Sequence, residues 1–249
     1  MIKKIIIAGL SLFLTTNAIA SEEIFSDEIP WVWQSIITLS GGPAWTSPGL
    51  DQISYVSEIT PLYPTQHYIP NSGNQTIGAG EIFFGLQRVV SPGITAQLGL
   101  GIAGAFDPEI SGVIVVENQS NLYTYRYNVE HARLELKGKL IASTYRVQPY
   151  VSGSFGVAMN SSHNWQATSE DPVLFPPMVY GPDSNAAFAY SLGAGIQAML
   201  NAHWQVGVGY EFADLGKSGL APDELFGFPG ITLTHLYTNE LLFSISYLY

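Results

Sequence analysis

The sequence predicts an all-β protein, an eight-stranded antiparallel transmembrane β-barrel, and three observations lead to this fold. Apolar residues alternate with small or polar ones through eight segments, the pattern of strands with two different faces. Only 12% of the residues are charged while 47% are hydrophobic, whereas about 25% of residues are charged in an average soluble domain. The connections between the eight segments alternate between short and long.

The first 20 residues read as a secretory signal peptide. Two lysines precede an apolar run over residues 5–14, and Ala18-Ile19-Ala20 supplies the small residues of a cleavage site. The run is too short for a membrane-spanning helix, which needs about 20 apolar residues. We therefore expect a signal peptide over residues 1–20, a short acidic periplasmic lead over residues 21–32 and the barrel over residues 33–249.

Composition excludes several classes of protein. Without Lys3 and Lys4, seven basic residues remain against 20 acidic ones, so the net charge after cleavage is −13. A nucleic-acid partner is excluded at that charge, because affinity for phosphate depends on Lys and Arg. The chain has no cysteine, so it can form neither a disulfide nor a lipid-modified cysteine anchor.

Each predicted strand has one apolar face. In residues 33–45, 76–88, 94–103 and 132–140, these faces carry Ile37, Leu39, Trp45; Ile82, Phe84, Leu86; Ile94, Leu98, Leu100, Ile102; and Leu134, Leu136, Leu140. In residues 151–159, 188–198, 204–212 and 241–249, they carry Val151, Phe155, Val157, Met159; Phe188, Tyr190, Leu192, Ile196; Trp204, Val206, Val208, Tyr210, Phe212; and Leu241, Phe243, Ile245, Tyr247, Tyr249. This alternation alone would also fit a soluble β-sandwich.

The lengths of the connections favour the barrel. The links after the second, fourth and sixth strands are short, whereas those after the other strands span roughly residues 46–75, 106–121, 161–184 and 213–236. Short periplasmic turns, long outer loops and an even strand number are the layout of outer-membrane barrels. Aromatic residues at both ends of the strands predict two interfacial girdles, with Trp33, Trp204 and Tyr247 in one and Trp45, Phe106, Phe188 and Phe212 in the other.

By its strand number, loop lengths and aromatic last strand, S-I-S-Y-L-Y, the chain resembles the small eight-stranded outer-membrane β-barrel family, which includes the outer membrane protein A transmembrane domain. The resemblance covers residues 33–249. It implies location in the bacterial outer membrane and contact with outer-membrane lipid and lipopolysaccharide. It also implies recognition of the last strand by the outer-membrane assembly machinery, with Phe243, Tyr247 and Tyr249 as the assembly signal, although Tyr249 stands where Phe is commoner.

The inward-facing positions predict an ion-pair network in the lumen. Its expected members are Glu81, Arg133, Glu135, Lys137, Glu211 and Glu240. Carboxylates in such an enclosed interior need cationic partners, because burial disfavours an isolated charge. Two interpretations stay open: the network is a structural plug, or it is the gate of a narrow water-filled path.

Neither an enzyme nor a metal centre is expected. In the lipid A deacylase family a serine stands two positions after the catalytic histidine, and none of the five histidines here has one. His235, at an outward-facing position near the rim, is the best remaining candidate for a base. The alternative is that His235 is simply a polar residue of the rim. The acidic residues of the loops lack the spacing of a calcium loop, and we expect no cofactor.

The long loops carry the most individual chemistry. They contain the aromatic residues Tyr63, Tyr68, Phe175, Tyr180, Phe226 and Phe228 among Pro and Gly, which predict irregular structure. These rings could bind a host or cell-surface ligand, or pack together over the barrel mouth. The sequence therefore predicts a non-enzymatic outer-membrane barrel with a structural or adhesive surface role; the alternatives are a narrow channel for small solutes and a lipid A-modifying enzyme.

Overall fold

The computed structural model describes residues 32–47, 52–54, 66–71, 76–105, 109–116, 123–144, 146–169, 179–222 and 230–249. The strands are β1 (Gln34–Ser47), β2 (Gln52–Ser54), β3 (Gln66–Pro70), β4 (Thr76–Ser91), β5 (Ile94–Ala105), β6 (Glu109–Val116), β7 (Tyr123–Ala142), β8 (Val147–Thr168), β9 (Asp183–Met199), β10 (Trp204–Asp214), β11 (Ser218–Gly219), β12 (Thr232–Leu233) and β13 (Tyr237–Leu248). Within these ranges there is no helix long and apolar enough to cross a membrane. The predicted signal peptide, nearly all of the lead, and Tyr63, Phe106, Phe175, Phe226 and Phe228 lie outside the described residues.

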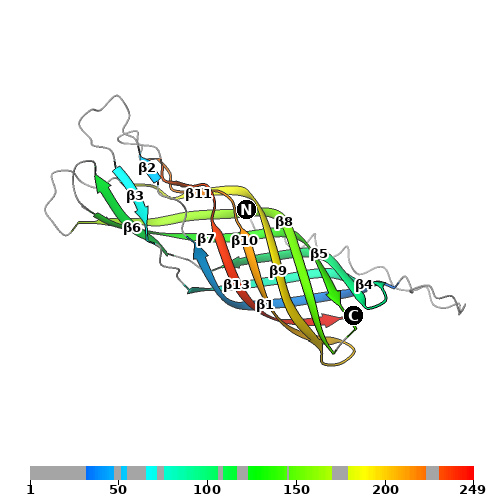
Figure 1. Ribbon diagram of the computed structural model, residues 1–249. Coiled ribbons are helices and arrows are strands. Elements are labelled where there is room, and N and C mark those ends of the chain that lie inside the picture. Colours follow the sequence, from blue (N-terminus) through cyan, green and yellow to red (C-terminus); the bar gives the residue numbers. More distant parts are fainter. Residues whose placement is uncertain are drawn as a thin grey trace, which may run out of the picture.

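Eight of these strands close into a barrel (Figure 1). Their order around the ring is β1, β4, β5, β7, β8, β9, β10 and β13, and every neighbouring pair is antiparallel. The ring closes where β13 pairs with β1, from Ile36 opposite Leu248 to Ser47 opposite Tyr237. The eight predicted strands are thus confirmed, although most are longer than the alternation indicated.

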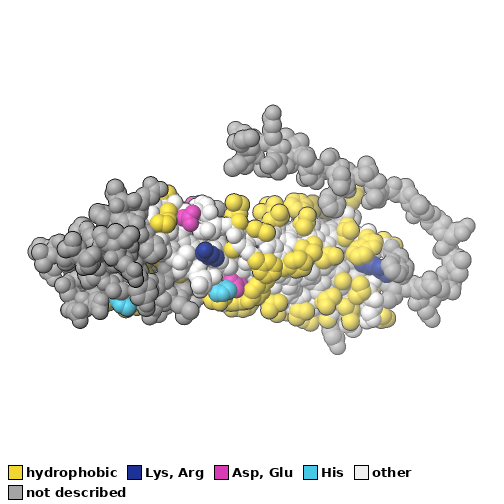
Figure 2. All heavy atoms as spheres, turned by 90° about the horizontal axis from the view of Figure 1, so that it is seen from above, with side chains coloured by type: hydrophobic (Ala, Val, Ile, Leu, Met, Phe, Trp, Pro, Cys, Tyr) yellow, Lys and Arg dark blue, Asp and Glu magenta, His cyan; other side chains and the backbone are white. Residues whose placement is uncertain are grey.

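The apolar faces of the strands point outward. Ile37, Leu98, Leu134, Leu192 and Phe243 are all at least half exposed, and most of the predicted outward set is exposed. Figure 2 shows hydrophobic side chains as a broad band on the face in view, with charged side chains beyond its ends. A large exposed apolar surface on a folded chain requires an apolar solvent, so the band marks the lipid-facing part of the barrel.

One side of the barrel wall continues beyond the band as a sheet. β7 and β8 run for 20 and 22 residues, and β6 pairs with the part of β7 that β5 does not reach. β3 pairs with β6, and β2 pairs with β3 (Figure 1). The predictions of an irregular loop over residues 46–75 and of a long connecting loop over residues 106–121 were therefore wrong for β2, β3 and β6, because isolated β-branched and aromatic runs can join an existing strand edge despite nearby Pro and Gly.

A bulge in β8 reverses which side chains face inward. Arg126 lies opposite Gln166 while Asn128 lies opposite His163, so two residues of β8 face one residue of β7. Asn164 takes the left-handed conformation there, with φ of 58°, which Asn tolerates better than most residues. After the bulge the odd positions face inward, and Trp165 packs against the interior core.

That core closes the outer mouth of the barrel. It joins β3, β6, β7 and β8 to the segments around β11 and β12, with Tyr68, Tyr127, Val129, Leu215 and Leu236 nearly inaccessible. Tyr68 and Tyr180 are buried within it, at 1% and 4% exposure. Of the two roles considered for the loop aromatics, these two residues pack over the mouth and are not available to a ligand.

Candidate functional site

Arg133 on β7 is the centre of a buried ion-pair network in the lumen. Its Nη2 lies 2.6 Å from Glu211 Oε1 on β10, its Nη1 lies 3.1 Å from Glu240 Oε1 on β13, and its Nε lies 3.1 Å from Glu135 Oε2. The side chain of Arg133 is 1% exposed, and those of its partners are at most 5% exposed. A planar guanidinium with several donors suits this kind of multiple pairing.

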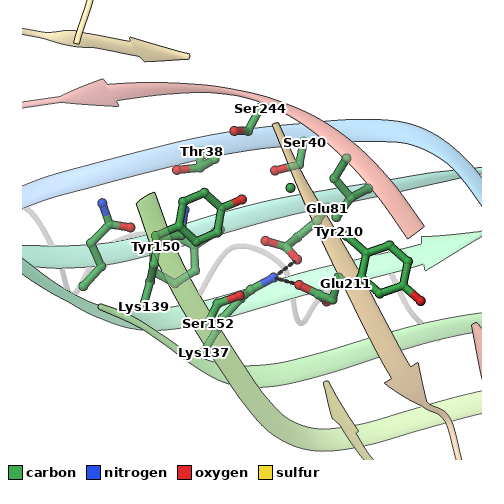
Figure 3. A pocket seen from close by; sticks show the side chains of 14 residues that line it. Thr38, Ser40, Glu81, Lys137, Lys139, Tyr150, Ser152, Tyr210, Glu211 and Ser244 are labelled. Carbon is green, nitrogen blue, oxygen red and sulfur yellow. Dashed lines mark hydrogen bonds and ion pairs between the residues drawn. The ribbon is translucent and has the colours of Figure 1, made fainter. Parts of the chain in front are cut away.

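Lys137 continues the network four residues further along the same face of β7. Its Nζ contacts Glu81 Oε2 on β4 and lies 2.6 Å from Glu211 Oε2 and 3.8 Å from Glu135 Oε1. Figure 3 shows Lys137 directed at both Glu81 and Glu211 across the lumen. The structure therefore brings together all six side chains that the inward parity had singled out.

The network extends across the whole lumen. In the ring order β13 lies four strands from β7, so the Arg133–Glu240 pair joins opposite walls. Hydroxyl groups satisfy further oxygens: Ser154 donates to Glu135 Oε2 at 2.7 Å and Thr238 donates to Glu240 Oε1 at 2.9 Å. The charged side chains of the network come from four different strands. Removing any one of them would leave a partner buried without its counter-charge, which is strongly destabilising.

Three of the carboxylates are close enough to ligate a metal ion. Oxygens of Glu81, Glu135 and Glu211 lie within 4.8 Å of one another. However, the ammonium group of Lys137 is within ion-pair distance of all three. A cation already occupies the position that a metal would take, so the donor set fits an ion-pair plug and does not fit a metal centre.

A small polar cavity lies on the periplasmic side of the network (Figure 3). Its volume is about 30 Å³, and its lining includes Thr38, Ser40, Ser152 and Ser244. Lys139 and Tyr150 also line this cavity, and Lys139 Nζ lies 4.2 Å from the centre of the Tyr150 ring. Gly209 lies opposite that ring, and a Cβ there would stand 2.1 Å from the Tyr150 hydroxyl, so the ring would have to shift.

Glutamines form the next layer towards the periplasmic end. Gln97 donates to Gln87 at 2.7 Å, and Gln197 contacts both Gln148 and Gln205 at 3.4 Å. These five side chains come from β4, β5, β8, β9 and β10. From the periplasmic end outward, the lumen therefore contains the glutamine layer, the small hydroxyl-lined cavity, the ion-pair network and the aromatic mouth.

The aromatic mouth is held by hydrogen bonds as well as packing. The Tyr68 hydroxyl donates to Gln66 Oε1 at 2.8 Å and lies 3.0 Å from the Tyr180 hydroxyl. The Trp165 ring packs edge-on against Tyr180 at 5.0 Å and stacks on Tyr125 at 5.4 Å. Burial, together with the neighbouring phenol of Tyr180, raises the pKa of Tyr68 above its ordinary value.

The predicted assembly-signal residues lie on the lipid-facing side of the last strand. Phe243, Tyr247 and Tyr249 are 58%, 37% and 77% exposed. At the periplasmic end Tyr247 packs edge-on against Trp204 at 5.0 Å, and Trp33 lies under the guanidinium of Arg88. Amphipathic rings gathered in this way are typical of a membrane interface.

His235 lies at the outer rim and has an acidic partner. Its Nδ1 is 2.9 Å from Asp214 Oδ2, and its side chain is 53% exposed while that of Asp214 is 6% exposed. Sequence reasoning found His235 but missed Asp214. The signal was available, because the antiparallel pairing of β10 with β13 places Asp214 opposite Tyr237, two positions from His235.

The glutamine layer and the Lys139–Tyr150 contact were also missed. Gln87, Gln97 and Lys139 share the inward parity of the network residues, so the alternation pointed to them. Their partners come from strands far apart in the sequence, and only the shear of the closed barrel sets which side chains share a level.

The closed ring of eight strands and its outward-facing apolar band define a small transmembrane β-barrel. The sequence pattern of the outer membrane protein beta-barrel domain matches residues 67–247. The chain therefore belongs to this family and is a protein of the bacterial outer membrane.

Solved barrels of low sequence identity are similar in structure. Neisserial surface protein A is 9% identical, with a TM-score of 0.47 over 86% of this chain and 96% of its own. The outer membrane protease OmpT from Escherichia coli is 8% identical, with a TM-score of 0.45 over 87% and 97%. The outer membrane protein OprG from Pseudomonas aeruginosa is 14% identical, with a TM-score of 0.37 over 86% and 95%. No curated protein sequence matches the chain significantly.

Proposed function

We propose that this protein is a non-enzymatic, plugged outer-membrane barrel with a structural or adhesive role at the cell surface. The observation that carries the proposal is the ion-pair network, which ties β7 to the opposite wall of the barrel. The interior of an eight-stranded barrel is just wide enough for side chains to fill it. The barrel then serves as an anchor, and its function belongs to the parts outside the membrane.

The extended sheet beyond the band is the surface best suited to a partner. Register places Ile69, Val113, Thr124 and Thr168 in one cross-strand row, and Ile69 is 39% exposed. A row of β-branched side chains on a rigid sheet offers contact area at little entropic cost. The ligand we propose is a host or cell-surface molecule, and the assembly machinery and lipopolysaccharide are the proposed partners within the membrane.

Adhesion of cells that display the protein tests this role. Val113→Lys places a charge in the middle of the row, and Thr232→Lys is the matched control on β12, where Thr232 is exposed but lies outside the row. Cells with Val113→Lys should adhere to host cells no better than cells without the protein, while Thr232→Lys should adhere like the wild type. Equal adhesion by both variants, at equal surface amounts, would exclude this row as the adhesive surface.

A narrow channel is the second candidate, favoured by the hydroxyl-lined cavity beside the network. Single-channel recording in planar bilayers separates the two, with Lys137→Ala as the probe. A gate predicts discrete current steps that Lys137→Ala alters with little loss of stability. A plug predicts a silent wild-type protein and a marked loss of stability in the variant, because Glu81 and Glu211 lose their partner.

Lipid A modification is the third candidate and rests on His235. Position 237 holds tyrosine where the lipid A deacylase pattern has serine. Mass spectrometry of lipid A acyl chains from cells expressing the wild type or His235→Gln should show no difference. Acyl loss with the wild type alone would establish an enzyme.

A further inference from the structure

The outer rim contains an ordered histidine that neither the plugged anchor nor the channel uses. The exposed His235 ring has Nδ1 held by the buried Asp214 carboxylate, at 2.9 Å from Oδ2 and 3.2 Å from Oδ1. A histidine whose Nδ1 is fixed by a carboxylate presents Nε2 in a defined direction. Orientation of this kind is typical of imidazoles that act on a ligand.

The backbone around this pair is fixed on both sides. The Gly216 N–H donates to Asp214 Oδ1 at 2.9 Å, which forms a turn closed by the aspartate side chain, and Gly216 has a φ of +67°. Leu215 N–H donates to Leu236 O at 2.8 Å, and Leu236 N–H donates to Gly216 O at 2.9 Å. His235 is therefore held by its side chain and by the hydrogen bonds of the residue that follows it.

A series of aromatic rings adjoins the histidine. The Tyr237 ring is parallel to His235, with an interplanar angle of 1° and centroids 5.6 Å apart. Phe212 stacks on Tyr237 at 5.7 Å, and Tyr190 lies 6.5 Å beyond Phe212. These rings continue the outward face of β9, β10 and β13, so they meet the level where lipid headgroups begin.

The periplasmic rim offers a comparison, because it also has a histidine that stacks on an aromatic ring. His203 stacks on Tyr247 at 5.9 Å, with an interplanar angle of 19°. Among the described residues it has no acidic partner. Stacking at an interface therefore needs no carboxylate, and the Asp214 carboxylate at the outer rim indicates a further role for His235.

The kind of ligand follows from the donors present. The described residues hold one group of three or more potential metal ligands, and it lies in the lumen, so no such group lies at the described part of the rim. In its protonated form the ring has a second donor at Nε2, on a side chain that is 53% exposed, and Lys217 adds an exposed cation three positions from Asp214. Figure 2 shows cationic, histidine and acidic side chains near one another beyond the band.

We propose that the His235–Asp214 pair and its aromatic neighbours bind the phosphorylated saccharide headgroup of an outer-leaflet glycolipid. Nε2 of His235 donates to the phosphate, Asp214 balances the charge of the ring, and Tyr237 and Phe212 contact the apolar faces of the sugar. The site is independent of the loop ligand and of the state of the lumen.

Binding of lipid A to the full-length mature protein in phosphatidylcholine nanodiscs tests the proposal. His235→Gln is compared with His203→Gln, the matched substitution at the other rim. A charge-assisted hydrogen bond contributes enough that its loss should weaken lipid A binding about tenfold, while His203→Gln should stay within about twofold of the wild type. Unchanged affinity in His235→Gln would overturn the site.

Two further probes separate the parts of the ligand. Dephosphorylated lipid A should bind the wild type about tenfold more weakly and should not distinguish it from His235→Gln. Phosphatidylglycerol supplies a phosphate without the sugar, and binding as tight as that of lipid A would overturn the saccharide contact. Tyr237→Leu, which leaves the His235–Asp214 pair in place, should weaken lipid A but not phosphatidylglycerol, and heat-dependent gel mobility confirms that each variant is folded.

Discussion

Replacing Arg133 by methionine should destabilise the barrel strongly. The substitution keeps the length of an unbranched side chain but leaves Glu135, Glu211 and Glu240 without the guanidinium that each contacts at 2.6–3.1 Å. Removing one partner of a buried ion pair costs about 3–5 kcal/mol, because an uncompensated charge remains in a low-dielectric interior. The free energy of unfolding, from urea titration in phospholipid vesicles monitored by tryptophan fluorescence, measures the effect.

Two companion variants make this measurement specific. Arg126→Met removes an exposed arginine that binds Gln166 at 2.6 and 3.0 Å, and it should cost less than about 1 kcal/mol. Adding Glu240→Gln to Arg133→Met should restore part of the lost stability, since one unpaired charge disappears. If Arg133→Met unfolds within 1 kcal/mol of the Arg126→Met control, the network contributes little and the reasoning for a structural plug fails.

Further substitutions test other parts of the structure. Gly216→Ala should destabilise by about 1–3 kcal/mol, since φ is +67° and a Cβ would stand 2.7 Å from Phe188 O, whereas Gly78→Ala, with nothing within 4 Å, should be neutral in the same urea titration. Tyr68→Ala should lower the free energy of unfolding by about 3–5 kcal/mol, because the whole ring is lost. Tyr68→Phe should lower it by about 1 kcal/mol, because only the hydrogen bonds of the hydroxyl are lost. Because the pKa of Tyr68 is raised in the folded state, the unfolded state loses that proton first, so stability should fall as pH rises above about 10, and less so in Tyr68→Phe. Replacing Phe243, Tyr247 and Tyr249 together by alanine should lower the amount of folded protein in the outer membrane, measured by heat-dependent gel mobility, and an unchanged amount would exclude them as the assembly signal.

The alternation of side chains was sufficient to predict the ring of eight strands. In β7 it even identified the lumen network, because Arg133, Glu135 and Lys137 alternate with three leucine or glycine positions on a face that must meet lipid. The pattern could not show that β7 continues outward to Tyr123. The outer part of the strand has tyrosine at inward positions and threonine or arginine at outward ones, which reverses the polarity expected of a lipid-facing segment.

The bulge at Asn164 shows a different limit. A period of two places Trp165 on the outward face of β8, and only the extra residue opposite Tyr127 turns it inward. Nothing in the local sequence requires this. The tyrosines that pack on Trp165 come from β3, β7 and the connection between β8 and β9, so the interior position becomes favourable only when those segments have assembled.

Closure of the ring sets the order in which the barrel can fold. The pair that seals it joins Ile36 to Leu248, about 200 positions apart, and closing a loop of that length costs about 5 kcal/mol of chain entropy before any contact compensates. Pairing between neighbouring hairpins is far less costly and comes first. Until the seam closes, β1 and β13 each present an unpaired edge of main-chain donors and acceptors, so these two strands are the parts of the chain most exposed to aggregation on the way to the membrane.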